Sequence, residues 1–321
     1  ILGLPKQLQW VIKRTRLYFL PVCPPKIMPR LFACCLSLVT LALVVSWTAA
    51  VDAQEKPNAA VDLPGLLCFW DFQQKADDGY VSRGTYAYKL QPKNGPITTS
   101  EEGVFGGSLQ VRQGQWLMIP RAECPGLNLH GQDEVTIVAW IQRKSDADWQ
   151  YIAGMWNERD AKRQYALFTC AARQTNFETM DRIPAKHQTH GYASDVGGAT
   201  PGKPFCFSYA SGETKLPKGK WTMIAYTYDH EFLRVYVDGK LDEKPGFNPF
   251  AWDKPIFEGG KDGADFTVAR QCLPNWPHYP NAEKPMLRQG FGGKLAGLAV
   301  FKRALSANEL VKMHEVTLAD K

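Results

Sequence analysis

Apolar and polar residues alternate along much of the chain, which is the pattern of half-buried β-strands. Every second residue from Val135 to Ile141 is apolar, and the same alternation runs from Leu233 to Val237. Asp238-Gly239 follows the second run directly, and this dipeptide is a strong signal for a tight turn into a short return strand at 240–241. We therefore expect antiparallel hairpins over these segments.

Two further segments, Met223 to Tyr228 and Leu295 to Phe301, are apolar at nearly every position. Strands that are covered on both faces have this composition, so we expect both in the middle of a sheet that packs against a second layer. One helix is well signalled, because Ser306 and Glu309 form a capping box ahead of an apolar stretch. The pattern predicts an all-β fold of two packed antiparallel sheets with one short C-terminal helix.

Three long segments interrupt this pattern. Residues 171–220, 245–262 and 272–290 are polar and rich in Gly and Pro. Segments of this length inside a compact domain are usually functional or disordered. We expect the first of them to be a long loop insertion in the domain.

The beginning of the chain has the features of an export leader. Met28 is the first methionine, and it opens a short basic segment that is followed by an uncharged apolar run. Small residues precede Gln54 and form a cleavage site, so we predict a signal peptide over 28–53. Because the apolar run is long for such a peptide, an uncleaved membrane anchor is the alternative. A third hypothesis is lipidation, because Leu31–Cys34 resembles a lipoprotein processing box.

This interpretation divides the chain into four parts. Residues 1–27 are an upstream extension, and 28–53 are the signal peptide. The polar residues 54–63 form a linker, and residues 64–321 form a single domain. We expect the product outside the cytoplasm, either secreted, periplasmic or at the cell surface, and without a membrane span in its mature form.

The net charge of +6 belongs to the leader and not to the domain. Residues 1–53 hold six of the 38 Lys and Arg side chains and one of the 32 Asp and Glu side chains, which leaves 32 basic and 31 acidic groups. A nearly neutral domain has no general attraction for nucleic acid or anionic lipid. The aromatic content of 12%, with ten Trp, agrees with an all-β sandwich.

The part after the leader contains an odd number of cysteines, namely Cys68, Cys124, Cys170, Cys206 and Cys272. Outside the cytoplasm, one or two disulfides with a free thiol are one interpretation, and buried apolar thiols are the other. Cys170 and Cys206 are our candidate disulfide, because they flank the long polar segment on what we expect to be neighbouring strands.

Five segments, taken in order, resemble the laminin-G-like branch of the concanavalin A-like lectin/glucanase superfamily. They are Leu67–Phe72, Phe105–Val111, Val135–Ile141, Lys220–Lys240 and Phe291–Ser306. The fourth is the most specific, with Trp221 opening one strand and Asp238-Gly239 closing the next. The resemblance spans nearly the whole domain and implies a jelly-roll sandwich.

The resemblance also implies a structural calcium ion and a binding module without catalysis. In the last strand, however, Ala296 follows the first apolar position, where the family commonly has an acidic residue. Asp262 and Asp265, in a Gly-rich turn, are the candidate calcium ligands, because closely spaced carboxylates suit this ion. A solvated turn is the alternative.

Catalytic signatures are incomplete. Laminarinase-like glycosidases on this fold carry a Glu-x-Asp-x-x-Glu motif on one strand. Here Glu158 and Asp160 match its first two acidic positions, but Arg163 stands at the third. A carboxylate pair from distant strands remains an alternative. His187 and His190 have the spacing of two zinc ligands, although nothing in the sequence supplies the others, so we expect a solvated pair.

Aromatic residues outside the expected core are the candidate ligand-binding groups. An exposed ring can stack on the apolar face of a sugar while neighbouring polar side chains bind its hydroxyls. The candidates are Trp156, Asn157, Glu158, Tyr192, Asp195, Trp276 and Tyr279. We expect the region around Trp156 to meet the long polar segment on one face of the sandwich. The alternative is that these rings only cover the ends of the core.

These observations favour a secreted, non-enzymatic module that binds carbohydrate or mediates adhesion, with a glycan or a cell-surface ligand as partner. A glycoside hydrolase with an unrecognised carboxylate pair is the second hypothesis. A purely structural surface protein is the third.

Overall fold

The computed structural model describes residues 63–131, 134–260, 262–272 and 290–319. Residues 56–321 form a compact unit of their own, and the description below concerns this unit. The predicted leader, most of the predicted linker, Trp276 and Tyr279 lie outside the described residues.

The first sheet contains nine antiparallel strands in the order β17-β16-β15-β8-β20-β6-β5, with β1 also paired to β20 and β18 to β16. Their bounds are β1 Leu66–Trp70, β5 Thr98–Ser100, β6 Ser108–Val111, β8 Val135–Arg143, β15 Trp221–Tyr228, β16 Phe232–Val237, β17 Lys240–Leu241, β18 Phe250–Ala251 and β20 Gly293–Phe301. Both expected central strands, β15 and β20, pair directly with β8.

The second sheet also contains nine antiparallel strands, in the order β14-β13-β10-β9-β19-β7-β4-β3-β2. Their bounds are β2 Lys75–Ala76, β3 Gly79–Val81, β4 Lys89–Lys93, β7 Trp116–Ile119, β9 Trp149–Asn157, β10 Lys162–Cys170, β13 Gln188–Ala193, β14 Tyr209–Ser211 and β19 Phe266–Val268. A separate hairpin pairs β11 Arg173–Thr175 with β12 Arg182–Pro184. Two short 3₁₀ turns, Arg121–Glu123 and Pro125–Leu127, follow β7.

The main core lies between the two sheets, and it confirms the predicted alternation. The four apolar residues at every second position from Val135 to Ile141 belong to this core, together with Leu233 and Val235. Asp238 and Gly239 both have positive φ, 50° and 80°, as the predicted tight turn requires. The two-sheet antiparallel sandwich is therefore the fold of this domain, and it is consistent with a jelly roll.

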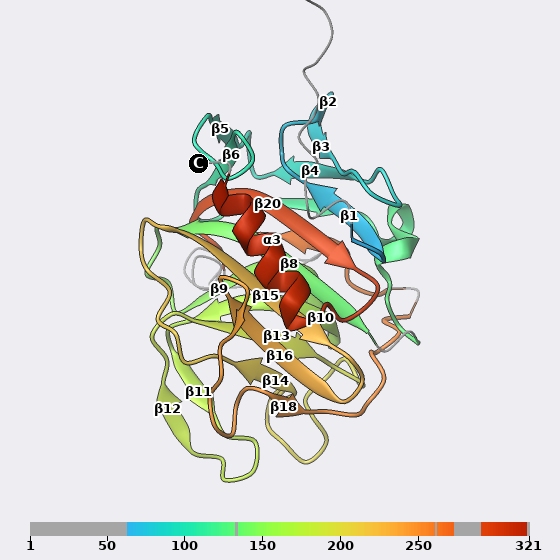
Figure 1. Ribbon diagram of the computed structural model, residues 1–321. Coiled ribbons are helices and arrows are strands. Elements are labelled where there is room, and N and C mark those ends of the chain that lie inside the picture. Colours follow the sequence, from blue (N-terminus) through green and yellow to red (C-terminus); the bar gives the residue numbers. More distant parts are fainter. Residues whose placement is uncertain (1–62, 132–133, 261, 273–289, 320–321) are drawn as a thin grey trace, which may run out of the picture. The chain divides into compact units, whose positions relative to one another are not determined.

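The single described α-helix, α3 Ala307–Ala319, lies across the outer face of the first sheet (Figure 1). Its Leu310 and Met313 pack with Trp140 in a second apolar cluster. The capping box forms as predicted, since the Glu309 amide donates to Ser306 Oγ at 3.3 Å and the Ser306 amide donates to Glu309 Oε2 at 2.8 Å. Among the described residues, no helix is long and apolar enough to span a bilayer.

The outer face of the second sheet carries a third apolar cluster. Along β10, Tyr165 and Leu167 face the main core, whereas Ala166 and Phe168 face this outer cluster. Tyr192 from β13 and Tyr209 from β14 join the outer cluster as well. A sandwich strand that is apolar on both faces must be covered on both faces, and here the cover comes from the segments between β10 and β14.

The segment 171–220, predicted as a long loop insertion, contains the short strands β11, β12, β13 and β14, and its remaining residues lie outside strands. Strand β13 is polar in sequence, yet all six of its residues are buried between β10 and β14. Gly191 allows this packing, since a Cβ there would lie 2.1 Å from Cδ2 of Tyr226. The polar composition of β13 therefore marks buried, hydrogen-bonded strand residues.

Candidate functional site

A cavity of about 200 Å³ opens on the outer face of the second sheet, over strands β9, β10, β13 and β14. Seven of its twelve lining residues are aromatic: Trp149, Trp156, Phe168, Tyr192, Phe205, Phe207 and Tyr209. The other five are Glu158, Arg163, Arg173, Thr175 and Cys206. We refer to this space below as the aromatic cavity.

The inner wall of the aromatic cavity is a set of contacting rings. Phe168 lies 6.0 Å from Trp156 and 5.3 Å from Tyr192 between ring centroids, with edge-to-face geometry in both pairs. Tyr192 in turn lies 5.0 Å from Tyr209. Because Trp156 and Tyr192 are only 2% and 7% exposed, these two predicted binding residues belong mainly to the packed cluster. Phe205 differs from them, as it is 52% exposed.

One end of the cavity carries an ion pair. Arg163 Nη2 lies 3.6 Å from Glu158 Oε1, and the Arg163 guanidinium also lies over the ring of Trp156, 5.8 Å from its centroid. Arg163 Nη1 donates a further hydrogen bond to the carbonyl of Gly197 at 3.2 Å. The Arg163 guanidinium is thus fixed by three neighbours, while the Glu158 carboxylate stays half exposed.

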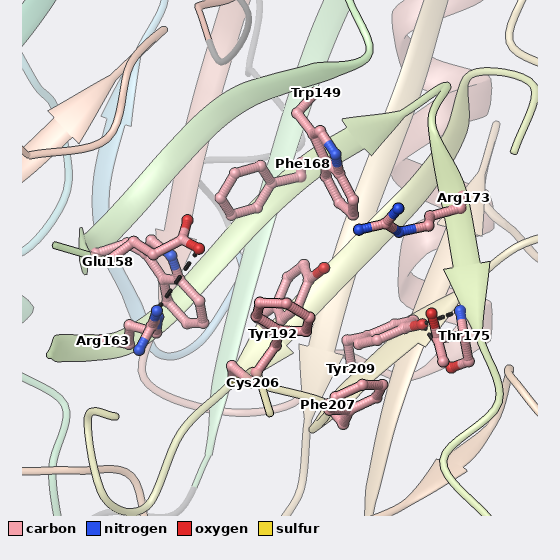
Figure 2. A pocket seen from close by; sticks show the side chains of 12 residues that line it. Trp149, Glu158, Arg163, Phe168, Arg173, Thr175, Tyr192, Cys206, Phe207 and Tyr209 are labelled. Carbon is pink, nitrogen blue, oxygen red and sulfur yellow. Dashed lines mark hydrogen bonds and ion pairs between the residues drawn. The ribbon is translucent and has the colours of Figure 1, made fainter. Parts of the chain in front are cut away.

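The opposite side of the cavity is built by strand β11. Figure 2 shows Arg173 extending from this strand toward the aromatic rings, with the Thr175 backbone beside the Tyr209 hydroxyl. The Tyr209 hydroxyl holds the strand in place, because it donates to the Thr175 carbonyl at 2.7 Å and accepts the Thr175 amide at 2.7 Å. Within the described part of the chain, no carboxylate lies within ion-pair distance of Arg173.

The Tyr192 hydroxyl is turned toward the side of the cavity where Arg173 lies (Figure 2). No hydrogen-bond partner is found for it among the described residues. Burial raises the pKa of Tyr192 well above its ordinary value of 10.0, so the phenol stays protonated and can donate a hydrogen bond.

Behind these rings lies His190, which is completely buried. Its Nε2 is 2.8 Å from Ser211 Oγ, and its ring stacks on Tyr209 at 5.1 Å between centroids. Burial lowers the pKa of His190 from 6.5 to about 3. The ring is therefore neutral near pH 7, and the expectation of a solvated His pair is wrong because the strand pairing of β13 buries this residue.

The other predicted binding residues do not line the aromatic cavity. Asn157 is buried, and its side chain caps the following turn through hydrogen bonds with the Asp160 carboxylate and amide, at 2.9 and 3.1 Å. Asp195 is half-buried after the end of β13. Trp276 and Tyr279 lie outside the described residues. The structure thus brings Trp156, Glu158 and Tyr192 together, and their binding role stays a prediction.

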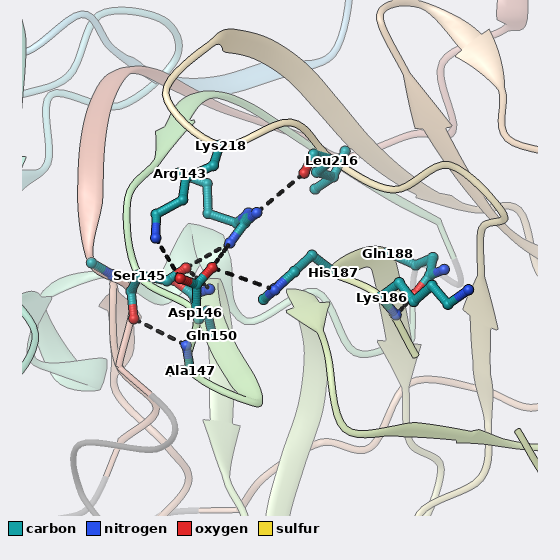
Figure 3. Close-up of polar contacts among 11 residues, drawn as sticks. Arg143, Ser145, Asp146, Ala147, Gln150, Lys186, His187, Gln188, Leu216 and Lys218 are labelled. Carbon is teal, nitrogen blue, oxygen red and sulfur yellow. Dashed lines mark hydrogen bonds and ion pairs between the residues drawn. The ribbon is translucent and has the colours of Figure 1, made fainter. Parts of the chain in front are cut away.

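His187 lies at a separate, polar cleft around Asp146 (Figure 3). His187 Nε2 is 3.7 Å from Asp146 Oδ1, and Arg143 Nη1 donates to the same oxygen at 3.0 Å. Lys218 also pairs with this carboxylate. Burial, with Arg143 adding repulsion, lowers the pKa of His187, while the hydrogen bonds from Lys218 and Arg143 lower the pKa of Asp146 to about 2.

The turn with Asp262 and Asp265 is already hydrogen-bonded in part. Asp265 Oδ1 accepts the amide of Arg121 at 2.8 Å, whereas Asp262 is exposed. No group of three or more His, Cys, Asp or Glu side chains among the described residues is placed to hold a metal ion. These two carboxylates alone do not form a calcium site, so calcium binding here stays a prediction.

The predicted Cys170–Cys206 disulfide is absent, and all five described cysteines are free thiols. Strand β13 lies between the two, and Cys170 pairs with Gln188 at one end of it. Ala193, at the other end, donates its amide to the Ser208 carbonyl at 3.2 Å. Along β13, Gln188 and Ala193 are five residues apart, which corresponds to about 16 Å. A disulfide requires that the Cα atoms of its two cysteines lie within about 7 Å of each other.

Several lining residues were missed by the sequence interpretation, most clearly Phe168, Arg173 and Phe205. Phe168 had a usable signal, because β10 is apolar at both odd and even positions and so must be covered on both faces. Phe205 had one as well, because Phe205, Phe207 and Tyr209 are aromatic at every second position. Arg173 had none, since it stands in a short polar segment whose pairing depends on the fold.

The two packed antiparallel sheets form a β-sandwich whose second sheet is covered on its outer face. Residues 120–270 match the laminin-G family described as the concanavalin A-like lectin/glucanases superfamily. Over these residues the chain is similar to that superfamily, and the two-sheet antiparallel sandwich is consistent with its jelly-roll fold. No curated protein matches the chain.

Solved structures of similar fold have low sequence identity to this chain. Domain 4 of AbnA, a GH43 extracellular arabinanase from Geobacillus stearothermophilus solved with arabinotriose, is 14% identical at a TM-score of 0.46, with 78% of this chain and 98% of that chain covered. A botulinum neurotoxin type C structure concerned with two ganglioside molecules is 10% identical at 0.43, with 79% and 51% covered. The chain thus spans about half the length of that neurotoxin chain.

Proposed function

We propose that the domain binds carbohydrate and takes one sugar ring into the aromatic cavity. The observation that carries this proposal is the combination of an aromatic wall with hydrogen-bonding groups at its edge. Sugar rings present apolar C–H faces that stack on aromatic rings, and their hydroxyls need donors and acceptors nearby. Phe205 supplies an exposed ring, and Glu158 and Thr175 supply polar atoms.

The size of the cavity supports a single ring as the bound unit. At about 200 Å³ it is smaller than the cavities that hold drug-sized ligands, which measure about 300–1,000 Å³. An internal stretch of a polysaccharide needs an open groove, whereas a terminal residue can enter a small cavity with one end. We therefore propose that the domain recognises a chain end.

Binding is a better proposal than hydrolysis for this cavity. Glycoside hydrolysis uses two carboxyl groups, about 5–5.5 Å apart for retention and about 6.5–9.5 Å apart for inversion. Glu158 is the one acidic side chain among the described residues that line the cavity, and it pairs with Arg163. A recognition site makes no such demand on its carboxylates.

Export through the predicted leader completes the proposal, because a glycan-binding module meets glycans outside the cell. The basic segment, the apolar run and the predicted cleavage site before Gln54 support this part.

A glycan array probed with the purified protein tests the proposal. We expect a restricted set of glycans that share their terminal residue, with binding that the free monosaccharide of that residue inhibits. If no glycan on an array of broad composition binds, or if only internal segments of long chains bind, the proposal fails.

A further inference from the structure

We propose that the sugar residue which enters the aromatic cavity carries a carboxylate, and that Arg173 binds it. This inference rests on the proposed carbohydrate-binding function and names the chemical class of its ligand. It starts from the charges that line the cavity, of which two are arginines and one is a glutamate. The lining therefore carries a net charge of +1.

The two arginines have different surroundings. Arg163 is almost buried and is committed to Glu158, to the Gly197 carbonyl and to the face of Trp156. Arg173 is exposed, and the described residues provide it with neither a carboxylate nor a side-chain hydrogen-bond acceptor. Only the second guanidinium is available to an anion that enters from solvent.

Strand β11 holds Arg173 at a fixed place beside the cavity. Residues at i and i+2 of a strand share a face, so Arg173 and Thr175 project together while Gln174 projects to the opposite side. Gln174 is completely buried, and its Nε2 donates to Ser211 Oγ at 2.6 Å. Because Tyr209 also clamps the Thr175 backbone, the segment that carries the guanidinium is anchored on both faces.

Further donors lie on the same side of the cavity. The Tyr192 hydroxyl is turned toward Arg173 in Figure 2, and Thr175 lines the cavity as well. A carboxylate accepts hydrogen bonds through two oxygens, and a guanidinium can donate two parallel N–H groups to it. A neutral sugar would offer this guanidinium only uncharged hydroxyl oxygens, which are weaker acceptors than a carboxylate. The fit is therefore to a terminal acidic sugar, with its ring against the aromatic wall.

A matched pair of ligands and a matched pair of variants test this inference. The ligands are an oligosaccharide that ends in a uronic or sialic acid and the methyl ester of the same oligosaccharide. The variants are Arg173→Gln and Arg182→Gln, because Arg182 lies on the same hairpin, opposite Thr175, and does not line the cavity. The third variant, Arg173→Lys, keeps the positive charge but lacks the planar guanidinium that can donate two parallel hydrogen bonds to a carboxylate. Dissociation constants are measured by calorimetry for each combination.

We expect the native protein to bind the acid at least about tenfold more tightly than its ester, because a hydrogen bond to a charged group contributes this much. Arg173→Gln should remove the difference, Arg173→Lys should restore part of it, and Arg182→Gln should retain it. Equal binding of acid and ester, a preference for sulfated over carboxylated glycans, or loss of the preference on Lys218→Gln at the other cleft would overturn the inference. Binding of neutral glycans alone would overturn it and leave the proposed function standing, whereas binding of no glycan would end both.

Discussion

The rings of Trp156 and Tyr192 meet at a centroid distance of 5.2 Å, although β10 separates their strands β9 and β13 within the sheet. The contact crosses the outer face of β10, and Phe168 from β10 contacts both rings. Both residues are at least nine-tenths buried by this contact and by the segments that cover it. They form the back wall of the aromatic cavity, which the domain needs for its packing whether or not a ligand is present.

Replacing Trp156 by Ala is accordingly expected to destabilise the domain. A buried Trp or Phe side chain that is cut back to Ala costs about 3–5 kcal/mol of unfolding free energy, through lost transfer energy and an unfilled cavity. Urea unfolding of Trp156→Ala measures this loss. Tyr192→Phe is the control, because it keeps the ring and removes only the hydroxyl. A Trp156→Ala variant as stable as the native protein would contradict the packing described here.

Phe205 is the residue whose loss should affect binding without affecting stability. Its ring is 52% exposed at the cavity, so Phe205→Ala removes little buried area and should change the unfolding free energy by less than about 0.5 kcal/mol. The loss of a stacking ring should weaken glycan binding by about 1 kcal/mol. Val196→Ala is the matched control, because Val196 is 42% exposed and does not line the cavity. Equal affinities of both variants would remove Phe205 from the site.

The unfolding free energy of the domain should decrease as the pH falls, because His190 is buried in its neutral form. The pKa of the folded-state ring is lowered to about 3, whereas the unfolded chain titrates near the ordinary 6.5. Below pH 6.5 the unfolded chain therefore binds a proton that the folded chain excludes, and the unfolding free energy decreases as the pH falls toward 3. Above pH 6.5 this contribution is fully present and constant.

The His190→Gln variant isolates this effect from other titrating groups, such as Asp146 and Glu309, whose lowered pKa values act at lower pH. Between pH 7 and pH 5 the native protein should lose about 1–2 kcal/mol more than the variant does. Urea unfolding at both pH values provides the comparison. Parallel losses in both proteins would mean that the His190 ring is protonated in the folded state.

The cysteines are expected to remain reduced in the folded protein. Burial raises the pKa of Cys68, Cys124, Cys170 and Cys272 to about 12, so their thiols should not react with alkylating reagents before unfolding. Mass spectrometry after alkylation in denaturant, without reductant, should find each of the domain's cysteines modified. A peptide that joins Cys170 to Cys206 would refute the strand order between them.

The predicted signal peptide determines where the exported protein should begin. If Met28 starts the protein and the signal peptide is cleaved, the exported product begins at Gln54. N-terminal sequencing of exported protein decides this point. A membrane-bound product that retains residues 28–53 would support the anchor instead.

Most of the sandwich could be predicted because its strands follow simple periodicity. The alternation from Val135 to Ile141 and the Asp238-Gly239 turn are local signals, and the structure places both as expected. Strand β13 could not be predicted in this way. Its Gln188, Thr189 and His190 are polar, and they are buried because neighbouring strands satisfy their backbone groups.

The candidate site was predictable only in part for the same reason. Trp156 and Tyr192 stand out as aromatic residues, but their burial depends on Phe168 and on the cover from later segments. Arg173 reaches the cavity because β11 pairs with β12 and Tyr209 clamps Thr175, contacts that local sequence does not encode. Long-range pairing thus decides which polar residues face the cavity.

A crystal structure of the protein with the glycan that it binds most tightly on the array would show whether one sugar ring occupies the aromatic cavity. We expect a terminal sugar ring in contact with Phe205 and the aromatic wall, with its polar groups toward Arg173 and Thr175. A glycan that is bound at full occupancy elsewhere, such as the cleft around Asp146, with the aromatic cavity unoccupied, would contradict this expectation.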